Sequence, residues 1–270
     1  MDRISLGIFP DNNQYYLRNI RKPDGDRYVM LQKEVMLSSA KYDDKILLEV
    51  WGDMFEKHCE AYAIISDATD DFCGYCAIKN TYHAKPEIAI ELFKKYQSKG
   101  IGFSALQKML AYVGERHNKP CFIAVVEPDN YASQGLMYKL GGVPGGIKKS
   151  GFLQEEDIDD FESENLNLLN SRINQIAKDF SVEPKKLLSH ALVFDIAVHN
   201  GLCENAGNRN RVNLQNAKND DRKISIAVRN YCMEAFLKKF ELILEKGSSN
   251  VELKELLEKE KKRLDKLSGI

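Results

Sequence analysis

No stretch of this chain approaches the roughly 18 consecutive apolar residues that a membrane-spanning helix requires. Its first residues also lack the long apolar core of a secretory signal peptide. We therefore expect a cytoplasmic protein with no membrane partner. The six cysteines are scattered over 270 residues, and in a cytoplasmic chain they indicate reduced thiols rather than a disulfide framework.

The chain also lacks an excess of either charge, because 39 basic side chains oppose 40 acidic ones and the formal net charge is −1. A protein that binds nucleic acid by neutralising its phosphates needs a broad positive surface. The balance therefore argues against nucleic acid as a partner, although it leaves room for a local basic patch. Apolar residues make up 43% and charged residues 29%, which is typical of a globular protein.

Spacings that signal a metal site or a hydrolase are absent as well. The five histidines form no H-x-x-x-H or H-E-x-x-H pattern, and no G-x-S-x-G motif occurs. The segment Cys73 to Cys76 has C-x-x-C spacing, but it lies in a run typical of a strand, where residues three apart point to opposite faces. No second ligand pair is evident at a suitable spacing, so we expect no metal site and interpret both thiols as structural.

What the sequence does contain is an α/β pattern over residues 14–142. Strands are predicted where aromatic and β-branched residues cluster between turn residues, and helices where apolar residues recur every three or four positions. The order predicts a mixed sheet with an antiparallel front part and a parallel crossover at its end. The predicted strands are 14–20, 60–66, 72–80, 87–93 and 121–126, and the predicted helices are 24–37, 43–58, 103–117 and 130–140.

A glycine-containing loop, Gln97 to Gly102, follows one predicted strand and opens the next helix. A helix start aims free backbone N–H groups and the positive end of the helix dipole at an anion. Glycine lets the backbone come close to phosphate oxygens, and nearby lysines add positive charge. The loop is neither a complete G-x-G-x-x-G fingerprint nor a P-loop, so alone it predicts only an anion-binding helix start. The lysines are Lys94, Lys95 and Lys99.

Together with the strand before it, the loop Q-S-K-G-I-G resembles the signature of the GNAT N-acetyltransferase superfamily, where it holds the pyrophosphate of acetyl-CoA. The segment from Val126 to Gly142, V-E-P-D-N-Y-A-S-Q-G-L-M-Y-K-L-G-G, resembles the second motif of that family. Its form N-x-A-S-Q…K-L-G is similar to the subgroup that acetylates the N-termini of ribosomal proteins. The resemblance covers residues 14–142 and implies a GNAT-type acyltransferase fold, here with a C-terminal helical extension.

The resemblance implies that the co-substrate acetyl-CoA lies in a V-shaped opening between the fourth and fifth strands. The backbone of residues 92–94 would pair with the pantetheine arm, residues 98–102 would hold the pyrophosphate, and Asn130 would contact the arm from the other side. An amide near Phe93 is expected to polarise the thioester oxygen. The predicted cofactor-binding residues are Leu92, Phe93, Lys94, Gln97, Ser98, Lys99, Gly100, Ile101, Gly102, Asn130 and Ser133.

Acetyl transfer from a thioester to an amine needs a base for the amine and a proton for the departing thiolate. Glu87 and Glu91 share one face of their predicted strand. Glu87 stands where many family members have a catalytic glutamate, so we predict Glu87 as the base and keep Glu91 as the alternative. Family members commonly have a tyrosine seven residues after the motif asparagine, where this chain has Met137. Tyr138 is next to it and is the predicted acid, with Ser133 as a substitute.

The predicted function is therefore acetyl-CoA-dependent N-acetyltransfer to a primary amine of a small molecule or of a protein or peptide. Because Met137 replaces the usual tyrosine, a non-catalytic acyl-CoA sensor or interaction protein on the same fold stays open. A third hypothesis is a peptide- or tRNA-linked aminoacyl transferase. It predicts a more basic surface, so the neutral charge balance argues mildly against it.

The rest of the chain, 153–270, is predicted to be mainly helical. Residues 187–198 form an apolar run that is either a buried helix or a returning strand. In the first case the GNAT-like domain is 1–152; in the second, 187–198 is its delayed last strand after a helical insertion, 153–186. We favour the insertion, because V-F-D-I is typical of a strand. The closing helices, 222–246 and 251–267, carry apolar stripes that a homodimer or a cap over the acceptor cleft would bury.

Overall fold

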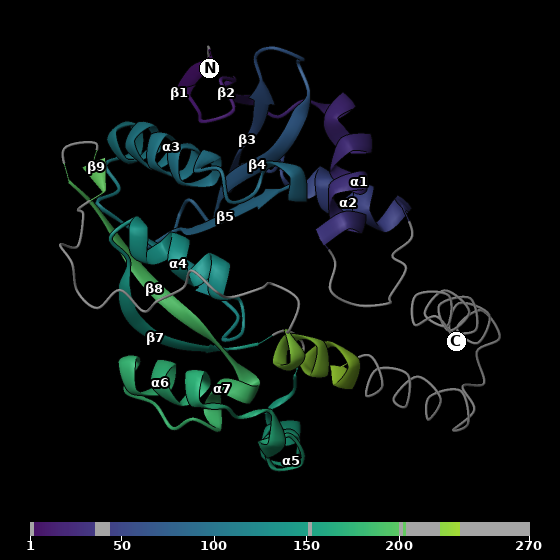
Figure 1. The fold of residues 1–270 in the computed structure, drawn as a ribbon, viewed down its shortest axis with the longest axis vertical. Helices are drawn as coiled ribbons and strands as arrows, with labels where there is room; N and C mark the ends of the chain where they lie inside the picture. Colours follow the sequence, from purple (N-terminus) through teal and green to yellow (C-terminus); the bar gives the residue numbers. More distant parts are fainter. Residues whose placement is uncertain (1–2, 36–43, 151–152, 200–201, 204–221, 233–270) are drawn as a thin grey trace.

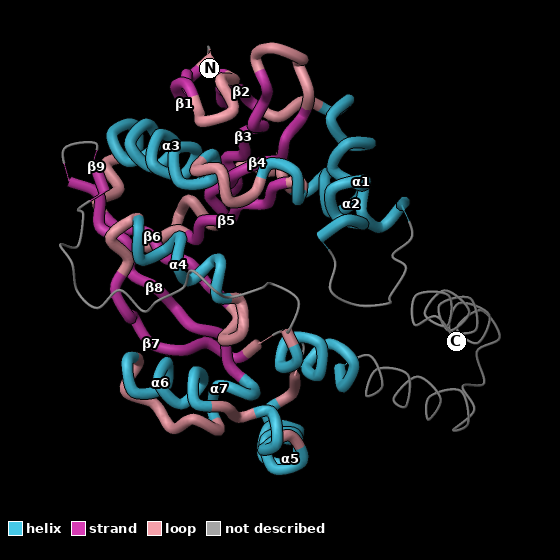
Figure 2. Tube along the Cα trace, viewed as in Figure 1, coloured by secondary structure: helices cyan, strands magenta, loops and turns pink. Residues whose placement is uncertain are grey.

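The computed structural model describes residues 3–35, 44–150, 153–199, 202–203 and 222–232. Within these ranges one mixed sheet runs in the order β1-β2-β3-β4-β5-β6-β8-β7, with β9 paired to β8 (Figure 1, Figure 2). Neighbouring strands are antiparallel except for β5 and β6, which are parallel. The strands are β1 Ile4–Ile8, β2 Gln14–Asn19, β3 Cys59–Ser66, β4 Phe72–Lys79, β5 Glu87–Leu92, β6 Cys121–Val126, β7 Val143–Lys149, β8 His190–His199 and β9 Leu202–Cys203.

Helices lie on both faces of this sheet. On one face the first turn of α3 meets Ile90 and Leu92 of β5, and Tyr138 of α4 meets β8. On the opposite face, α1 packs through Tyr28 against Tyr75 of β4 with ring centroids 5.7 Å apart, and α2 packs against α1. The helices are α1 Gly25–Val35, α2 Asp44–Asp53, α3 Ile101–His117, α4 Tyr131–Lys139, α5 Ile158–Glu164, α6 Ser171–Asp179 and α7 Lys186–Ser189, and residues 223–232 are also helical.

The parallel strands β5 and β6 pair at their N-terminal ends and then separate. Their register contains the single pair Glu87↔Ile123, which the bond from the Ile123 N–H to the Pro86 carbonyl supports at 2.9 Å. Beyond that pair, neither residues 88–92 nor residues 124–126 have a partner across the gap in the described register. We call this unpaired stretch the β5–β6 opening.

The apolar run at 187–198 is largely a strand, because β8 begins at His190 and lies between β6 and β7. Residues 153–189 contribute α5, α6 and α7 before β8 enters the sheet (Figure 1). The edge strand β1 was not predicted, since five residues with one buried side chain give little periodic signal.

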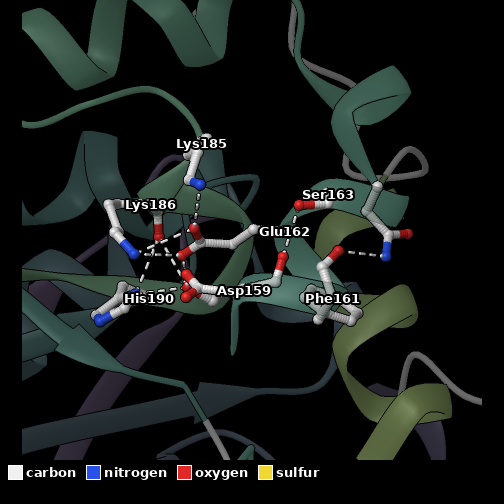
Figure 3. Close-up of polar contacts among 9 residues, drawn as sticks. Asp159, Phe161, Glu162, Ser163, Lys185, Lys186 and His190 are labelled. Atoms are coloured by element: carbon white, nitrogen blue, oxygen red, sulfur yellow. Dashed lines mark hydrogen bonds and ion pairs between the residues drawn. The ribbon is translucent and has the colours of Figure 1, made fainter. Parts of the chain in front are cut away.

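A buried carboxylate fixes α5 to α7 and to the start of β8. Glu162 is fully buried, and Lys186 Nζ lies 3.1 Å from each of its oxygens (Figure 3). Lys185 lies 3.5 Å away, and the Ser189 hydroxyl donates to the carboxylate at 2.6 Å. The same hydroxyl lies 2.6 Å from Nδ1 of His190, the first residue of β8. A buried carboxylate without partners is very costly, so α5 is stable only in the position where these partners reach Glu162.

Helix 222–246 was predicted as one element, and its described part, 223–232, is helical. The remainder of that helix and the predicted helix 251–267 lie outside the described residues. Within the described ranges, no helix combines the length and the apolar character that crossing a membrane demands.

Candidate active site

The first turn of α3 is an uncapped helix N-terminus. Its first intrahelical bond runs from the Ser104 N–H to the Gly100 carbonyl at 3.1 Å, so the N–H groups of residues 101–103 precede the helical ladder. Gly100 is the N-cap with a φ of 87°, and no side chain caps the helix there. Ser98 also takes a left-handed φ of 60°. The loop therefore leaves three amides and the positive end of a 17-residue helix for an anion.

Gly102 serves packing as well as the loop. A Cβ at this position would lie 3.3 Å from Cδ1 of Ile90 and 3.4 Å from Cδ1 of Leu92. The Ser104 hydroxyl donates to the Leu6 carbonyl at 2.9 Å, which ties the same turn to β1. The helix start is thus held against the sheet, and its amides have a definite position beside the end of β5.

Two of the three lysines predicted to favour the anion already face carboxylates. Lys99 Nζ lies 3.3 Å from Asp11, and Lys95 Nζ lies 3.9 Å from Asp71. Both lysines are at least 40% exposed, so these pairs contribute little to stability. A bound phosphate would compete with Asp11 for Lys99.

The ladder between β4 and β5 decides which backbone groups of β5 face the opening. The Phe93 N–H donates to the Cys73 carbonyl at 3.1 Å, and Gly74 lies opposite Leu92 in the register. In an antiparallel ladder this pattern turns the N–H and C=O of Leu92 away from β4. The same alternation turns the N–H and C=O of Ile90 away from β4. Among the described residues, the N–H groups that point into the β5–β6 opening from β5 without a ladder partner therefore belong to Ile90 and Leu92.

Three of the backbone groups predicted to pair with the cofactor have partners within the protein. The Leu92 carbonyl accepts a bond of 2.8 Å from the side-chain amide of Gln97. The Phe93 N–H donates to the Cys73 carbonyl of β4, and the Lys94 N–H donates to the carboxylate of Glu34 on α1. The expectation that an amide near Phe93 polarises a thioester oxygen therefore does not hold for the N–H of Phe93 itself. The N–H of Ile90, three residues earlier, has the required direction.

Glu91 lies on the face of β5 that α1 covers. Burial raises the pKa of Glu91, and hydrogen bonds and nearby positive charges oppose this rise. These opposing groups are the Gln32 amide, Lys79, the Tyr75 hydroxyl and Arg229. Gln32 comes from α1, Lys79 and Tyr75 from β4, and Arg229 from the helix at 223–232.

Glu87 has a different environment on the same face. It lies at the one β5–β6 pair, and thus at the closed end of the opening. Its carboxylate lies 3.6 Å from Nζ of Lys148, and its side chain is 26% exposed. Both glutamates stay candidates for the base, but Glu91 lies four residues nearer the wide end.

Tyr138 packs against β8. Its ring packs edge-on against Phe194 of β8 with centroids 5.1 Å apart. Burial and the charge of Asp179 on α6 raise its pKa. Since β8 lies beyond β6 in the sheet, Tyr138 is separated from Glu91 by the opening and by a strand. Met137, which replaces the usual tyrosine, is a buried core residue.

Asn130 is the N-cap of α4, and its side-chain oxygen accepts from the Ser133 N–H at 3.3 Å. Leu136, on the same helix, lies 3.8 Å from the Cβ position of Gly102. Residues 127–130 join β6 to α4, and the body of α4 lies beside the first turn of α3.

Residues 15–143 match the family model described as the acetyltransferase (GNAT) domain. This segment is a GNAT acetyltransferase domain. The matched segment contains α1, the β5–β6 opening, the first turn of α3 and α4, and the domain it matches supports acyl transfer. No curated protein matches the enzyme in sequence.

Several solved structures are similar to the acetyltransferase. Ribosomal-protein-S5-alanine acetyltransferase from Vibrio fischeri has a TM-score of 0.47 and 14% identity, covering 72% of this chain and 96% of its own. RimJ from Mycobacterium smegmatis, in complex with CoA-disulfide, has a TM-score of 0.49 and 15% identity, covering 73% and 87%. Spermidine N-acetyltransferase from Vibrio cholerae has a TM-score of 0.47 and 14% identity, covering 68% and 93%.

Sequence reasoning missed three side chains around Glu91, namely Gln32, Tyr75 and Arg229. The first two lie on predicted elements, but nothing local shows which strand residue they will meet. Arg229 lies more than 130 residues from β5 in the sequence, so only the tertiary structure brings its charge to this face.

Proposed function

We propose that this acetyltransferase takes its acetyl group from acetyl-CoA and transfers it to a primary amine of a small molecule or of a protein or peptide. The observation that carries the proposal is the β5–β6 opening, which leads from free strand amides to an uncapped helix start. The pantetheine arm contains amide carbonyl groups, and one of them can accept a hydrogen bond from the N–H of Leu92 at the edge of β5. The pyrophosphate suits the N–H groups of residues 101–103. Bound acetyl-CoA would supply the activated thioester.

Glu91 is our choice for the general base. A base that acts near neutral pH works best when its own pKa is raised toward that pH, and burial raises the pKa of Glu91. Its carboxylate takes the proton from the ammonium group of the acceptor, and the neutral amine attacks the thioester carbon. The N–H of Ile90 donates to the oxygen that becomes negative in this step.

The thiolate does not require Tyr138 in this mechanism. An alkyl thiol has a pKa near ~8.5, so a thiolate leaves readily and takes its proton from water. This agrees with the position of Tyr138 against Phe194, away from the opening. The predicted acid roles of Tyr138 and Ser133 are therefore not needed for turnover.

Calorimetry with acetyl-CoA and a thiol-release assay with a panel of amines test the proposal. We expect acetyl-CoA to bind and CoA thiol to appear with at least one amine or peptide. Absence of binding at millimolar acetyl-CoA would rule out the proposed donor. Tight binding without thiol release across the panel would favour the acyl-CoA sensor.

A further inference from the structure

The segment 127–130 joins β6 to α4 and is braced from inside by α4 itself. The side-chain amide of Gln134 donates to the Pro128 carbonyl at 2.8 Å and to the Glu127 carbonyl at 3.3 Å. Gln134 is 3% exposed, so these bonds are shielded from water. The Asn130 N–H also donates to the Glu127 carbonyl, at 2.9 Å. The backbone of the segment is therefore held on its inner side.

The outer side of this segment is held by the helix at 223–232. Asp129 is 5% exposed and accepts a bond of 2.9 Å from the backbone N–H of Ser225, which is itself 3% exposed. The Ser225 hydroxyl donates to the other oxygen of Asp129. Arg222 pairs with Glu127, and Arg229 lies 3.3 Å from Glu127. Both carboxylates of the segment are thus bonded to residues outside the family domain.

Besides these polar contacts, the helix at 223–232 is held by apolar packing. Ile224 and Val228 are buried in the main hydrophobic core. The Tyr231 ring meets Phe161 of α5 edge-on, with centroids 5.1 Å apart. The neighbouring residue on α5, Glu162, holds that helix to α7 through Lys186 and Ser189 (Figure 3). The helix that contacts residues 127–129 is therefore held in place by the hydrophobic core and by α5.

One polar group of the segment stays available. The Asn130 side-chain oxygen caps α4, but within the described ranges no hydrogen bond uses its amide nitrogen. Every other side chain of the segment that can hydrogen-bond has its partner, in Arg222, Arg229 or Ser225. An amide nitrogen at the edge of the β5–β6 opening suits a carbonyl oxygen of the pantetheine arm.

We infer that residues 222–232 are a positioning element of the active site, because they hold residues 127–129 and so aim the Asn130 amide at the arm of acetyl-CoA. Asp129 and Ser225 are positioning residues in this inference, since neither touches the reacting atoms. The inference rests on the proposed use of acetyl-CoA. It extends the cofactor site beyond the family domain to a helix about 80 residues after its end.

The test is Ser225→Ala in the full-length enzyme, which removes the hydroxyl donor and leaves the Asp129 carboxylate short of one bond. We expect the acetyl-CoA Kd from calorimetry, and its KM, to rise about tenfold. We expect kcat at saturating acetyl-CoA to change less than about twofold, because the groups on β5 are untouched. Ser225→Thr keeps the hydroxyl and should restore most of the affinity. Ser163→Ala is the matched control, since that exposed hydroxyl on α5 bonds only within its own helix.

The outcomes separate the inference from the proposed function. A wild-type enzyme that binds no acetyl-CoA overturns the proposed function and this inference together. A wild-type enzyme that binds, with a folded Ser225→Ala variant of equal affinity, overturns the inference alone. If Ser225→Ala fails to fold, Asp129→Asn takes its place, because the amide keeps an acceptor for the Ser225 N–H. Unchanged affinity in Asp129→Asn then overturns the inference.

Discussion

Glu91→Gln separates the chemistry of this carboxylate from its structural contacts. The Gln32 amide donates to Glu91, and a glutamine oxygen at the same position can accept that bond. Burial raises the folded-state pKa of Glu91 above its unfolded value. The stability that this shift contributes is fully present below the unfolded pKa and is lost as the pH rises through the folded pKa. A neutral amide avoids that loss, so Glu91→Gln should be at least as stable as the wild type at neutral pH.

The expected loss of activity is large. Removal of a general base typically lowers the rate by about 10² to 10⁴, which corresponds to about 2.7 to 5.5 kcal/mol of transition-state stabilisation. The wild-type kcat/KM should fall as the pH drops through the raised pKa of Glu91, because the protonated carboxyl cannot accept a proton. In Glu91→Gln the remaining activity should lose this acidic limb. The assay is thiol release between pH 5 and 9, with thermal unfolding measured in the same buffers.

Glu87→Gln is the matched control, since both glutamates lie on the same face of β5. Glu87 is 3.6 Å from a lysine that is 60% exposed, so the loss of this pair should cost less than about 1 kcal/mol of stability. We expect kcat/KM of this variant within about threefold of the wild type. A loss of ~10² or more in Glu87→Gln, with near-normal turnover in Glu91→Gln, would refute the choice of Glu91 and restore the base that the sequence predicted.

Two further predictions concern the close approach of β4 to β5 at Gly74 and the lysine beside the first turn of α3. Gly74→Ala should lower the free energy of unfolding by about 2 kcal/mol or more in urea titrations, because its Cβ would lie 2.1 Å from the Glu91 carbonyl. Gly52→Ala, with nothing within 4 Å of the new Cβ, should cost nothing, and equal losses in both would contradict the crowding argument. Lys99→Ala should weaken acetyl-CoA binding two- to fivefold at low salt, and Asp11→Asn should strengthen it, because Asp11 competes for Lys99. Weaker binding in Asp11→Asn would show that the aspartate supports the loop instead.

Much of the fold could be predicted because its signals are local. The predicted strand 121–126 coincides with β6, and the predicted strand 87–93 differs from β5 by one residue. Alternating side chains and flanking turn residues define such elements without any knowledge of their neighbours. The glycine loop and the helix after it form a signal of the same kind. The N-cap position of Asn130 follows a local rule of the same kind, since an asparagine just before a helix commonly accepts a bond from an N–H group of its first turn.

The environment of each predicted site residue depends on neighbours that are distant in the sequence. Which amide near Phe93 can polarise the thioester oxygen depends on the direction of each N–H group, and this direction is set by how β5 pairs with β4. A shift of one residue in that pairing reverses every backbone group, and the sequence of the strand alone does not fix it. The surroundings of Tyr138 depend on distant neighbours in the same way, because Phe194 of β8 and Asp179 of α6 lie beside its ring.

By itself the sequence determined the GNAT domain, the helix start after the glycine loop, and the presence of two carboxylates on one strand face. Each follows from spacing within a few turns or strands, where covalent geometry sets the relation between side chains. Only the tertiary structure decided which glutamate is buried, which amides of β5 are free, and that residues 222–232 hold the Asn130 segment. Those properties arise from desolvation and hydrogen bonds between segments far apart in the chain, which exist only once the sheet is assembled.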